Sequence, residues 1–178
     1  MTAGVAVWFR LAQAGDVPAV VDLVQSAYRG EVSRLGWTTE ADLLDGQRTD
    51  PEQVAAKMAK RESMIILAED GTGIAGCCHV ERLPQGQAYF GMFSVRPRQQ
   101  GQGLGRAILE KAEQMARENW GSTAMVMSVI AQRHELIAWY ERRGYQRTGG
   151  TEPFPYGDER FGIPKRPDLH FVVLAKEL

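Results

Sequence analysis

The segment 93–106 constrains the fold more than any other part of the chain. A strand-like apolar run ends at Val95, and a helical repeat begins at Leu104. Between them glycine alternates with other residues at Gly101, Gly103 and Gly105. Alternating glycines let a backbone approach a ligand closely, and the free N–H groups and dipole of a helix start favour an anion. The segment therefore predicts a backbone-made site for an anionic group, most simply a pyrophosphate.

Composition makes this segment stand out. The chain has 19 glycines in 178 residues, which is about 11% against a usual 7%. Most of the others, including Gly15, Gly71, Gly73 and Gly144, fall at expected turns. The three alternating glycines do not fit that pattern, because a tight strand-to-helix turn without a ligand needs fewer of them.

Two known phosphate-binding patterns are excluded by the residues themselves. A Walker loop requires Gly-Lys-Ser or Gly-Lys-Thr, which this loop lacks. A dinucleotide fingerprint reads G-x-G-x-x-G, but Arg106 stands where the third glycine belongs. That fingerprint also usually follows the first strand, whereas this loop lies in mid-chain. A dinucleotide-binding domain is therefore a weaker interpretation, which preferential binding of NAD over acetyl-CoA would support.

The order Gln100-x-x-Gly103-x-Gly105 resembles the Q/R-x-x-G-x-G/A signature of the GNAT superfamily of acyl-CoA-dependent N-acetyltransferases. The resemblance implies that the loop amides hold the pyrophosphate of acetyl-CoA. It also implies that backbone groups on the preceding strand pair with the pantetheine, here at Phe93 and Val95. The loop residues implicated as cofactor-binding are Gln100, Gly101, Gln102, Gly103, Leu104, Gly105 and Arg106.

A second block, Tyr140-x-x-x-Gly144-Tyr145, resembles the family pattern Y-x-x-x-G-F/Y. The resemblance implies that Tyr140 protonates the departing CoA thiolate, and a phenol is a chemically suitable acid for a thiolate. The alternative is that Tyr140 only packs on the apolar side of its helix. Many family members have asparagine seven positions earlier, where this chain has Arg133, a longer cation that would either reach a phosphate or carboxylate or be solvated. With the similar stretch 9–20, the resemblance spans almost the whole chain.

Acetyl transfer to an amine requires the neutral amine, so a base or a water chain should assist. Alternation along the expected strand 74–82 places His79 and Glu81 on one face, and Tyr89 lies on the next strand. We predict Glu81 as the base, with a solvated carboxylate at a strand edge as the alternative.

Two segments are candidates for the acceptor site. The stretch 28–48 carries Trp37, Glu40 and Arg48 among polar residues. The stretch 152–161 contains aromatic rings and prolines that would form a stiff wall, and acidic residues that would attract an ammonium group. The alternatives for the second stretch are a plain lid or a dimer contact.

Periodicity predicts an α/β fold, one domain over residues 1–178 with a mixed central β-sheet flanked by helices. The expected order, β-α-α-β-β-β-α-β-α-β-β, matches a GNAT-like fold. Residues 149–168 are expected to form a loop. The expected strands are 5–11, 64–68, 74–82, 87–95, 125–130, 145–148 and 170–175, and the expected helices are 17–28, one opening at Pro51, 104–119 and 134–143.

Charge and composition narrow the class of protein. The net charge is −1, so nucleic-acid and membrane-surface binding are not expected. We expect neither a transmembrane helix nor a signal peptide. The three histidines are far apart in sequence, so no metal site is expected. Cys77 and Cys78 are adjacent and would point to opposite faces of a strand, which indicates two reduced thiols in a cytoplasmic protein.

Together these features predict transfer of an acetyl group from acetyl-CoA, by direct attack on the thioester, to a primary amine of a small molecule or amino acid. A protein substrate is the close alternative. A non-catalytic acyl-CoA sensor is the alternative from another class, and the presence of Tyr140 favours the enzyme. The resemblance also suggests a homodimer.

Overall fold

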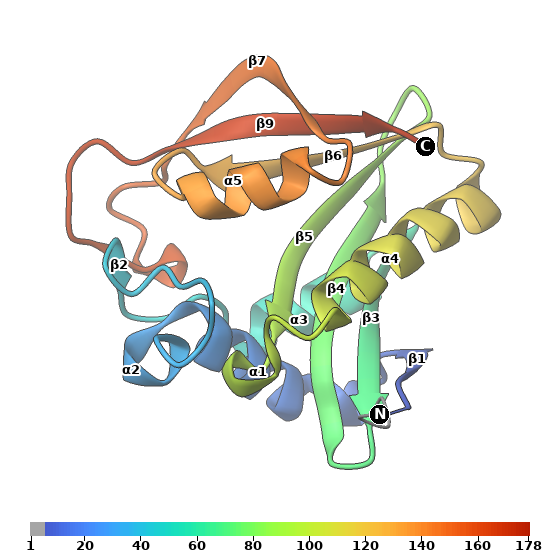
Figure 1. Ribbon diagram of the computed structural model, residues 1–178, viewed down its shortest axis with the longest axis horizontal. Coiled ribbons are helices and arrows are strands. Elements are labelled where there is room, and N and C mark those ends of the chain that lie inside the picture. Colours follow the sequence, from blue (N-terminus) through green and yellow to red (C-terminus); the bar gives the residue numbers. More distant parts are fainter. Residues whose placement is uncertain (1–5) are drawn as a thin grey trace.

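The computed structural model describes residues 6–178 and contains a seven-stranded mixed sheet (Figure 1). The strand order is β1-β3-β4-β5-β6-β9-β7, and β2 and β8 form a separate pair. Val5, the expected start of the first strand, lies outside the described residues. The strands are β1 (Trp8–Leu11), β2 (Leu44–Asp45), β3 (Ser63–Asp70), β4 (Gly73–Arg82), β5 (Gln87–Val95), β6 (Ala124–Ile130), β7 (Gln146–Pro153), β8 (Ile163–Pro164) and β9 (His170–Glu177), and the helices are α1 (Val17–Tyr28), α2 (Gly30–Ser33), α3 (Pro51–Ala59), α4 (Leu104–Trp120) and α5 (His134–Glu141).

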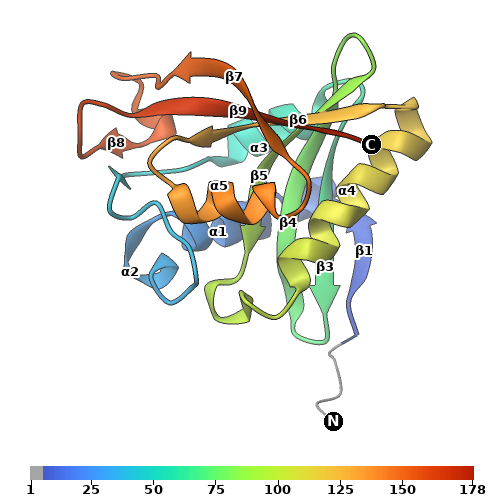
Figure 2. The same cartoon turned by 45° about the horizontal axis from the view of Figure 1, so that its top comes forward.

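Helices cover both faces of this sheet, so the fold has three layers (Figure 2). The side chains of β3 alternate between the layers: Ile66 packs with α4 and α5, whereas Ile65 and Leu67 pack with α1 and α3. Cys77 and Cys78 divide in the same way and are both free and buried, as their adjacency predicted. A sheet buried on both faces explains why these strands read as continuous apolar runs.

The sheet opens between β5 and β6, which is its one parallel pair among the described strands. The two strands pair only from Gln87 to Tyr89, and they then diverge, as Figure 1 shows. The register of β5 with β4 shifts between Cys77 and His79, opposite Met92, whose φ of 48° is left-handed. Such a bulge bends a strand and increases its twist. The divergence leaves one edge of β5 without a neighbouring strand.

The expected loop 149–168 is partly strand in the structure, which corrects that prediction. β7 continues to Pro153, and Ile163 pairs with Asp45 across the β2–β8 ladder. The sequence predicts only the start of β7, at 145–148. Its extension to Pro153 has no sequence signal, because β7 is an edge strand whose residues are all exposed, so no apolar alternation marks it. It forms because its backbone pairs with β9.

Candidate active site

The first cavity has a volume of about 320 Å³ and lies where the glycine loop meets β5 and α5. Gly101 and Gly103 have left-handed φ values of 78° and 88°, which L side chains rarely adopt. No atom lies within 4 Å of the position that a Cβ would take at either residue. The loop thus needs glycine for its backbone path, and it leaves open space in front of the helix that follows.

The start of α4 offers unpaired donors to that space. Gly103 is the N-cap of this 17-residue helix and provides no side chain to cap it. Ala107 is the first residue of α4 whose N–H donates to a carbonyl within this turn, that of Gly103, at 3.1 Å. The N–H groups of the preceding turn therefore remain available, and they lie at the positive end of the helix dipole. This arrangement suits a pyrophosphate, as the sequence predicted.

Most of the predicted cofactor residues line this cavity, and two do not. Gln102 is exposed, and its side chain contacts the Arg98 carbonyl at 3.4 Å. Leu104 turns its side chain into the core, so only its backbone faces the loop. The predicted residues that line the first cavity are Phe93, Val95, Gln100, Gly101, Gly103, Gly105 and Arg106.

The side chain of Gln100 fixes the loop rather than projecting into free space. Its Nε2 donates to the Val95 carbonyl at 3.1 Å, and its Oε1 accepts from the N–H of Thr38 at 3.2 Å. A Cβ on Gly36 would lie 2.4 Å from the same Oε1. The glutamine of the signature thus joins β5 to the segment after α2, and Gly36 is needed for that close approach.

The free edge of β5 presents Phe93 and Val95 to the opening. Arg96 donates its N–H to Ala75 on β4, so by alternation the backbone groups of Phe93 and Val95 face away from β4. The Phe93 carbonyl accepts from the Tyr28 hydroxyl at 2.7 Å, and the Val95 carbonyl accepts from Gln100. Both carbonyls are therefore engaged, while the N–H groups remain for a ligand.

A second cavity of about 400 Å³ lies on the other side of the β5–β6 divergence. It shares four residues with the first: Tyr28, Phe93, Arg133 and Leu136. The shared residues mark the place where the two cavities meet. A molecule bound in one cavity therefore abuts a molecule bound in the other.

Tyr140 lines the second cavity from α5. It is 4% exposed and packs among Phe90, Phe93, Trp139 and Tyr145. Burial raises the pKa of Tyr140 well above that of a free phenol, so the group is protonated at neutral pH. Its hydroxyl forms no hydrogen bond with residues 6–178, whereas the Tyr28 hydroxyl donates to the Phe93 carbonyl. Tyr140 therefore packs in the core and also has a hydroxyl group that is free to donate a proton.

A buried ion pair network forms one wall of the second cavity. Glu40 accepts from Arg29 at 2.5 Å through one carboxylate oxygen and from Arg133 at 2.9 Å through the other. Burial alone would raise the pKa of Glu40, but the charges of Arg133 and Arg29 outweigh burial and hold it below its usual value. Arg133 also donates to the Thr38 hydroxyl at 2.9 Å. The residue that departs from the family pattern thus binds a carboxylate of its own chain.

The predicted base Glu81 lines neither cavity. Its carboxylate pairs with Lys60 and lies 3.8 Å from the Nε2 of His79. His79 and Tyr89 do line the second cavity. Burial, together with the nearby charge of Lys57, lowers the pKa of His79 to about 4. Alternation correctly placed His79 and Glu81 on one face, but Glu81 lies farther along the strand, against Lys60.

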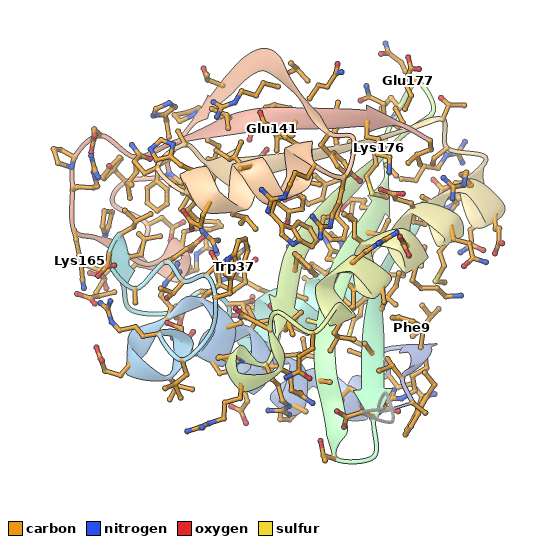
Figure 3. All side chains as sticks on the ribbon, viewed as in Figure 1. Phe9, Trp37, Glu141, Lys165, Lys176 and Glu177 are labelled. Carbon is orange, nitrogen blue, oxygen red and sulfur yellow. The ribbon has the colours of Figure 1, made fainter. Side chains whose placement is uncertain are left out.

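Both predicted acceptor segments contribute to the cavities. Trp37 lines the first cavity, and Glu40 and Arg48 line the second. Glu152, Phe154 and Phe161 line the second as well. Figure 3 labels Trp37 and Lys165, and Lys165 lies beside β2, where its side chain pairs with Asp45 at 3.1 Å. The two segments thus meet along the β2–β8 ladder.

Sequence reasoning missed several lining residues of the first cavity. Tyr28 ends α1 and begins the stretch 28–48 predicted for the acceptor site, but no motif predicts its place in the wall of the first cavity. Trp139 and Arg143 form a stacked pair, with the guanidinium carbon 3.6 Å from the ring centroid. The position of Trp139 next to Tyr140 was a usable signal, since both lie in the second motif.

The family model for the acetyltransferase (GNAT) family matches residues 19–145. The chain belongs to this family. The mouse (Mus musculus) protein named "Probable N-acetyltransferase family 8 member 5" is 28% identical over 107 residues, which are 57% of this chain and 47% of the mouse protein. The chain thus matches about half the length of this curated relative. The GNAT match includes both motifs, the glycine loop and the block that ends at Tyr145.

Solved structures share the fold of this GNAT chain. The ribosomal-protein-S18-alanine N-acetyltransferase of Escherichia coli superposes with a TM-score of 0.70 at 17% identity, over 97% of this chain and 94% of that one. A Bacillus anthracis protein described as a streptothricin acetyltransferase was solved in complex with acetyl coenzyme A. It superposes with a TM-score of 0.57 at 17% identity, over 70% of this chain and 67% of that one.

Two features are absent from the described residues. Across residues 6–178, no three or more His, Cys, Asp or Glu side chains are grouped so that they could hold a metal ion. Within the same part of the chain, no helix is long and apolar enough to cross a membrane.

Proposed function

We propose that this protein transfers the acetyl group of acetyl-CoA to a primary amine of a small molecule or amino acid, by direct attack of the amine on the thioester. One observation carries the proposal: two cavities meet at the β5–β6 divergence, and four residues line both. The first cavity suits the acyl donor and the second suits the acceptor. Bringing two reactants together in this way converts a bimolecular step into a nearly unimolecular one.

The donor fits the first cavity by the chemistry of its lining. The free amides at the start of α4 and the open space before Gly101 and Gly103 suit a pyrophosphate. The N–H groups of Phe93 and Val95 would pair with the pantetheine amides along β5. Acetyl-CoA, when bound, supplies the activated acyl group. A neighbouring N–H could also polarise the thioester carbonyl.

Tyr140 is the proton donor that we propose for the departing thiolate. Its hydroxyl is protonated and has no partner within residues 6–178. Tyr28 lines both cavities, but its proton is engaged with the Phe93 carbonyl. Tyr140 is therefore the better placed of the two to give a proton.

The acceptor ammonium must lose a proton to become the attacking amine, and that proton needs another acceptor. Glu81 is poorly placed for this, because it pairs with Lys60 and lines neither cavity. Glu40 is engaged by two arginines. Glu152 lines the second cavity, and its only side-chain bond within the described residues is from the Ser128 hydroxyl, at 2.9 Å. We therefore assign to Glu152 the attraction and the deprotonation of the ammonium group.

A small acceptor is favoured by the closure of the second cavity. The segment after α1 and the segment 154–165 are joined by the β2–β8 ladder and by the bond from Arg29 to the Phe161 carbonyl at 3.3 Å. Gln47 donates to the Arg160 carbonyl at 3.3 Å as well. The names of the structural relatives include one acting on a ribosomal protein and one on streptothricin, so both acceptor classes occur on this fold.

The test is release of CoA thiol from acetyl-CoA in the presence of a panel of amines, amino acids and peptides. Tyr140→Phe should lower kcat on the best acceptor by about 100-fold or more, the usual contribution of a positioned acid. Binding of acetyl-CoA, measured by calorimetry, should stay unchanged. Tyr145→Phe is the matched control, since Tyr145 is buried in the same core but donates to Glu113. Full activity in Tyr140→Phe would refute the acid role, and binding without transfer to any acceptor would favour a sensor.

A further inference from the structure

The second cavity contains more positive than negative side chains. The cationic residues that line it are Arg29, Arg48, Lys57 and Arg133, and the carboxylates are Glu40 and Glu152. Glu40 engages Arg29 and Arg133 through separate oxygens. Arg48 and Lys57 therefore face the cavity without an ion-pair partner among residues 6–178.

Arg48 is held in place by contacts other than a direct ion pair. Its backbone N–H donates to the side chain of Gln25 at 2.9 Å. Its guanidinium carbon lies 4.8 Å from the centroid of the Tyr28 ring, within the range of a cation–π contact. A guanidinium stacked on an aromatic ring keeps its N–H groups free to donate to an anion beside the ring.

Lys57 brings a second charge to the same region. Burial lowers the pKa of Lys57, and the positive charge of Arg48 lowers it further. The carboxylate of Glu81 acts on Lys57 in the opposite direction, but it is already paired with Lys60. Two partly buried cations that repel each other are destabilising unless an anion joins them.

From this arrangement we infer that the acceptor is an amine that also carries a carboxylate or a comparable oxyanion, which Arg48 and Lys57 bind in the second cavity. The inference rests on the proposed function and narrows its substrate class. A cavity of about 400 Å³ is large enough for an amino acid with its side chain. Arg48 would take two oxygens of the anion, and Lys57 would add a point charge.

The experiment compares matched acceptors. Each L-amino acid in a panel is assayed with acetyl-CoA beside its carboxamide and beside the amine that lacks the carboxyl group. In the wild type, kcat/KM for the best acid should exceed that of its amide by about 10- to 100-fold, the effect of one charge-assisted contact. Arg48→Gln should remove that preference, so that kcat/KM for the acid and kcat/KM for its amide differ by less than about threefold.

The controls separate charge from folding. Arg61→Gln removes an exposed arginine that lines neither cavity and should keep the preference for acids. Arg48→Lys should restore part of it, because a cation returns without the planar fork. Equal or faster turnover of the amides by the wild type would overturn the inference while leaving the acetyltransferase proposal intact.

A binding measurement tests the anion site even if no amine in the panel is acetylated. Benzoate and benzamide are compared as probes by saturation-transfer NMR with wild type and with Arg48→Gln. Saturation of benzoate alone, lost in the variant, supports an anion site even if no amine is acetylated, in which case the proposed function fails separately. Failure of benzoate to bind, or equal binding of benzamide, together with no preference for acids, overturns the inference.

Discussion

The hydroxyl of Tyr28 donates to the Phe93 carbonyl at 2.7 Å and so joins the end of α1 to the free edge of β5. Both residues line both cavities. The contact fixes the backbone of β5 at the point where donor and acceptor would meet. It also satisfies a carbonyl that has no strand beside it, because β6 has already diverged.

Removing this hydroxyl should lower both the free energy of unfolding and the affinity for acetyl-CoA. Tyr28→Phe is expected to lose about 1 kcal/mol of unfolding free energy, the usual net value of one hydrogen bond. Because the Phe93 N–H would then be less well oriented, acetyl-CoA should bind several-fold more weakly. Tyr156→Phe is the control, since its hydroxyl also bonds a backbone carbonyl, that of Arg166, outside both cavities. Calorimetric Kd values that agree in Tyr28→Phe and wild type would contradict the prediction.

Gly105 should be required for the ligand rather than for the helix. A Cβ there would lie 3.2 Å from Cζ of Phe93 and 3.6 Å from Cζ2 of Trp139, at the wall of the first cavity. Its φ is not left-handed, and alanine has the higher helix propensity, by up to about 1 kcal/mol. Gly105→Ala should therefore keep the Tm within a few degrees and weaken acetyl-CoA binding by about tenfold.

At the other end of α4, a glycine substitution should lower stability and leave acetyl-CoA binding unchanged. Gly121 has a φ of 62° and open space around its Cβ position. Gly121→Ala should lower the unfolding free energy by about 1 kcal/mol through backbone strain. Its Kd for acetyl-CoA should equal that of the wild type. If Gly105→Ala bound acetyl-CoA as well as Gly121→Ala does, the first cavity would not be the donor site.

Glu40 should be one of the most costly polar positions to change. It is 5% exposed and neutralises two buried arginines. Glu40→Gln leaves both charges without a carboxylate, and breaking a buried pair typically costs about 3–5 kcal/mol. Urea unfolding should show a loss of at least about 3 kcal/mol. Glu31→Gln, which breaks only an exposed pair with Arg34, should change stability by less than about 1 kcal/mol.

His79 should make the protein less stable in acid. Its pKa is about 4 in the folded chain against an ordinary 6.5, so between these values the unfolded chain binds a proton that the folded chain does not. His79 therefore leaves the free energy of unfolding undiminished above pH 6.5. As the pH drops toward 4, protonation of this residue in the unfolded chain lowers that free energy. At pH 5 this one group accounts for a loss of about 2 kcal/mol relative to neutral pH.

Substitution tests that assignment. Nε2 of His79 lies 2.8 Å from the Ser63 hydroxyl, a contact that glutamine can imitate. The difference in unfolding free energy between pH 7 and pH 5 should be about 2 kcal/mol smaller in His79→Gln than in the wild type. His170→Gln changes an exposed histidine and should leave the difference unaltered. An unchanged pH dependence in His79→Gln would show that another group is responsible.

Local patterns were enough to predict the sheet and the glycine loop that lines the first cavity. The seven strands of the main sheet were each indicated by an apolar run or by the turns around it, and Gly101, Gly103 and Gly105 all line the predicted anion site or its loop. These features depend on residues close together in sequence. The position of Glu81 illustrates what such reasoning leaves open, because alternation fixes the face of a strand and not the distance along it to a cavity.

By itself the sequence determined the glycine loop before α4, since a left-handed backbone and a helix start are local properties of Gly101 to Leu104. Only the tertiary structure decided what lines the second cavity. Arg48 and Lys57 come from segments with no motif, and Glu152 comes from an edge strand with no apolar pattern. They meet because the divergence of β5 from β6 opens the sheet, and strand pairing between distant segments has no local signal.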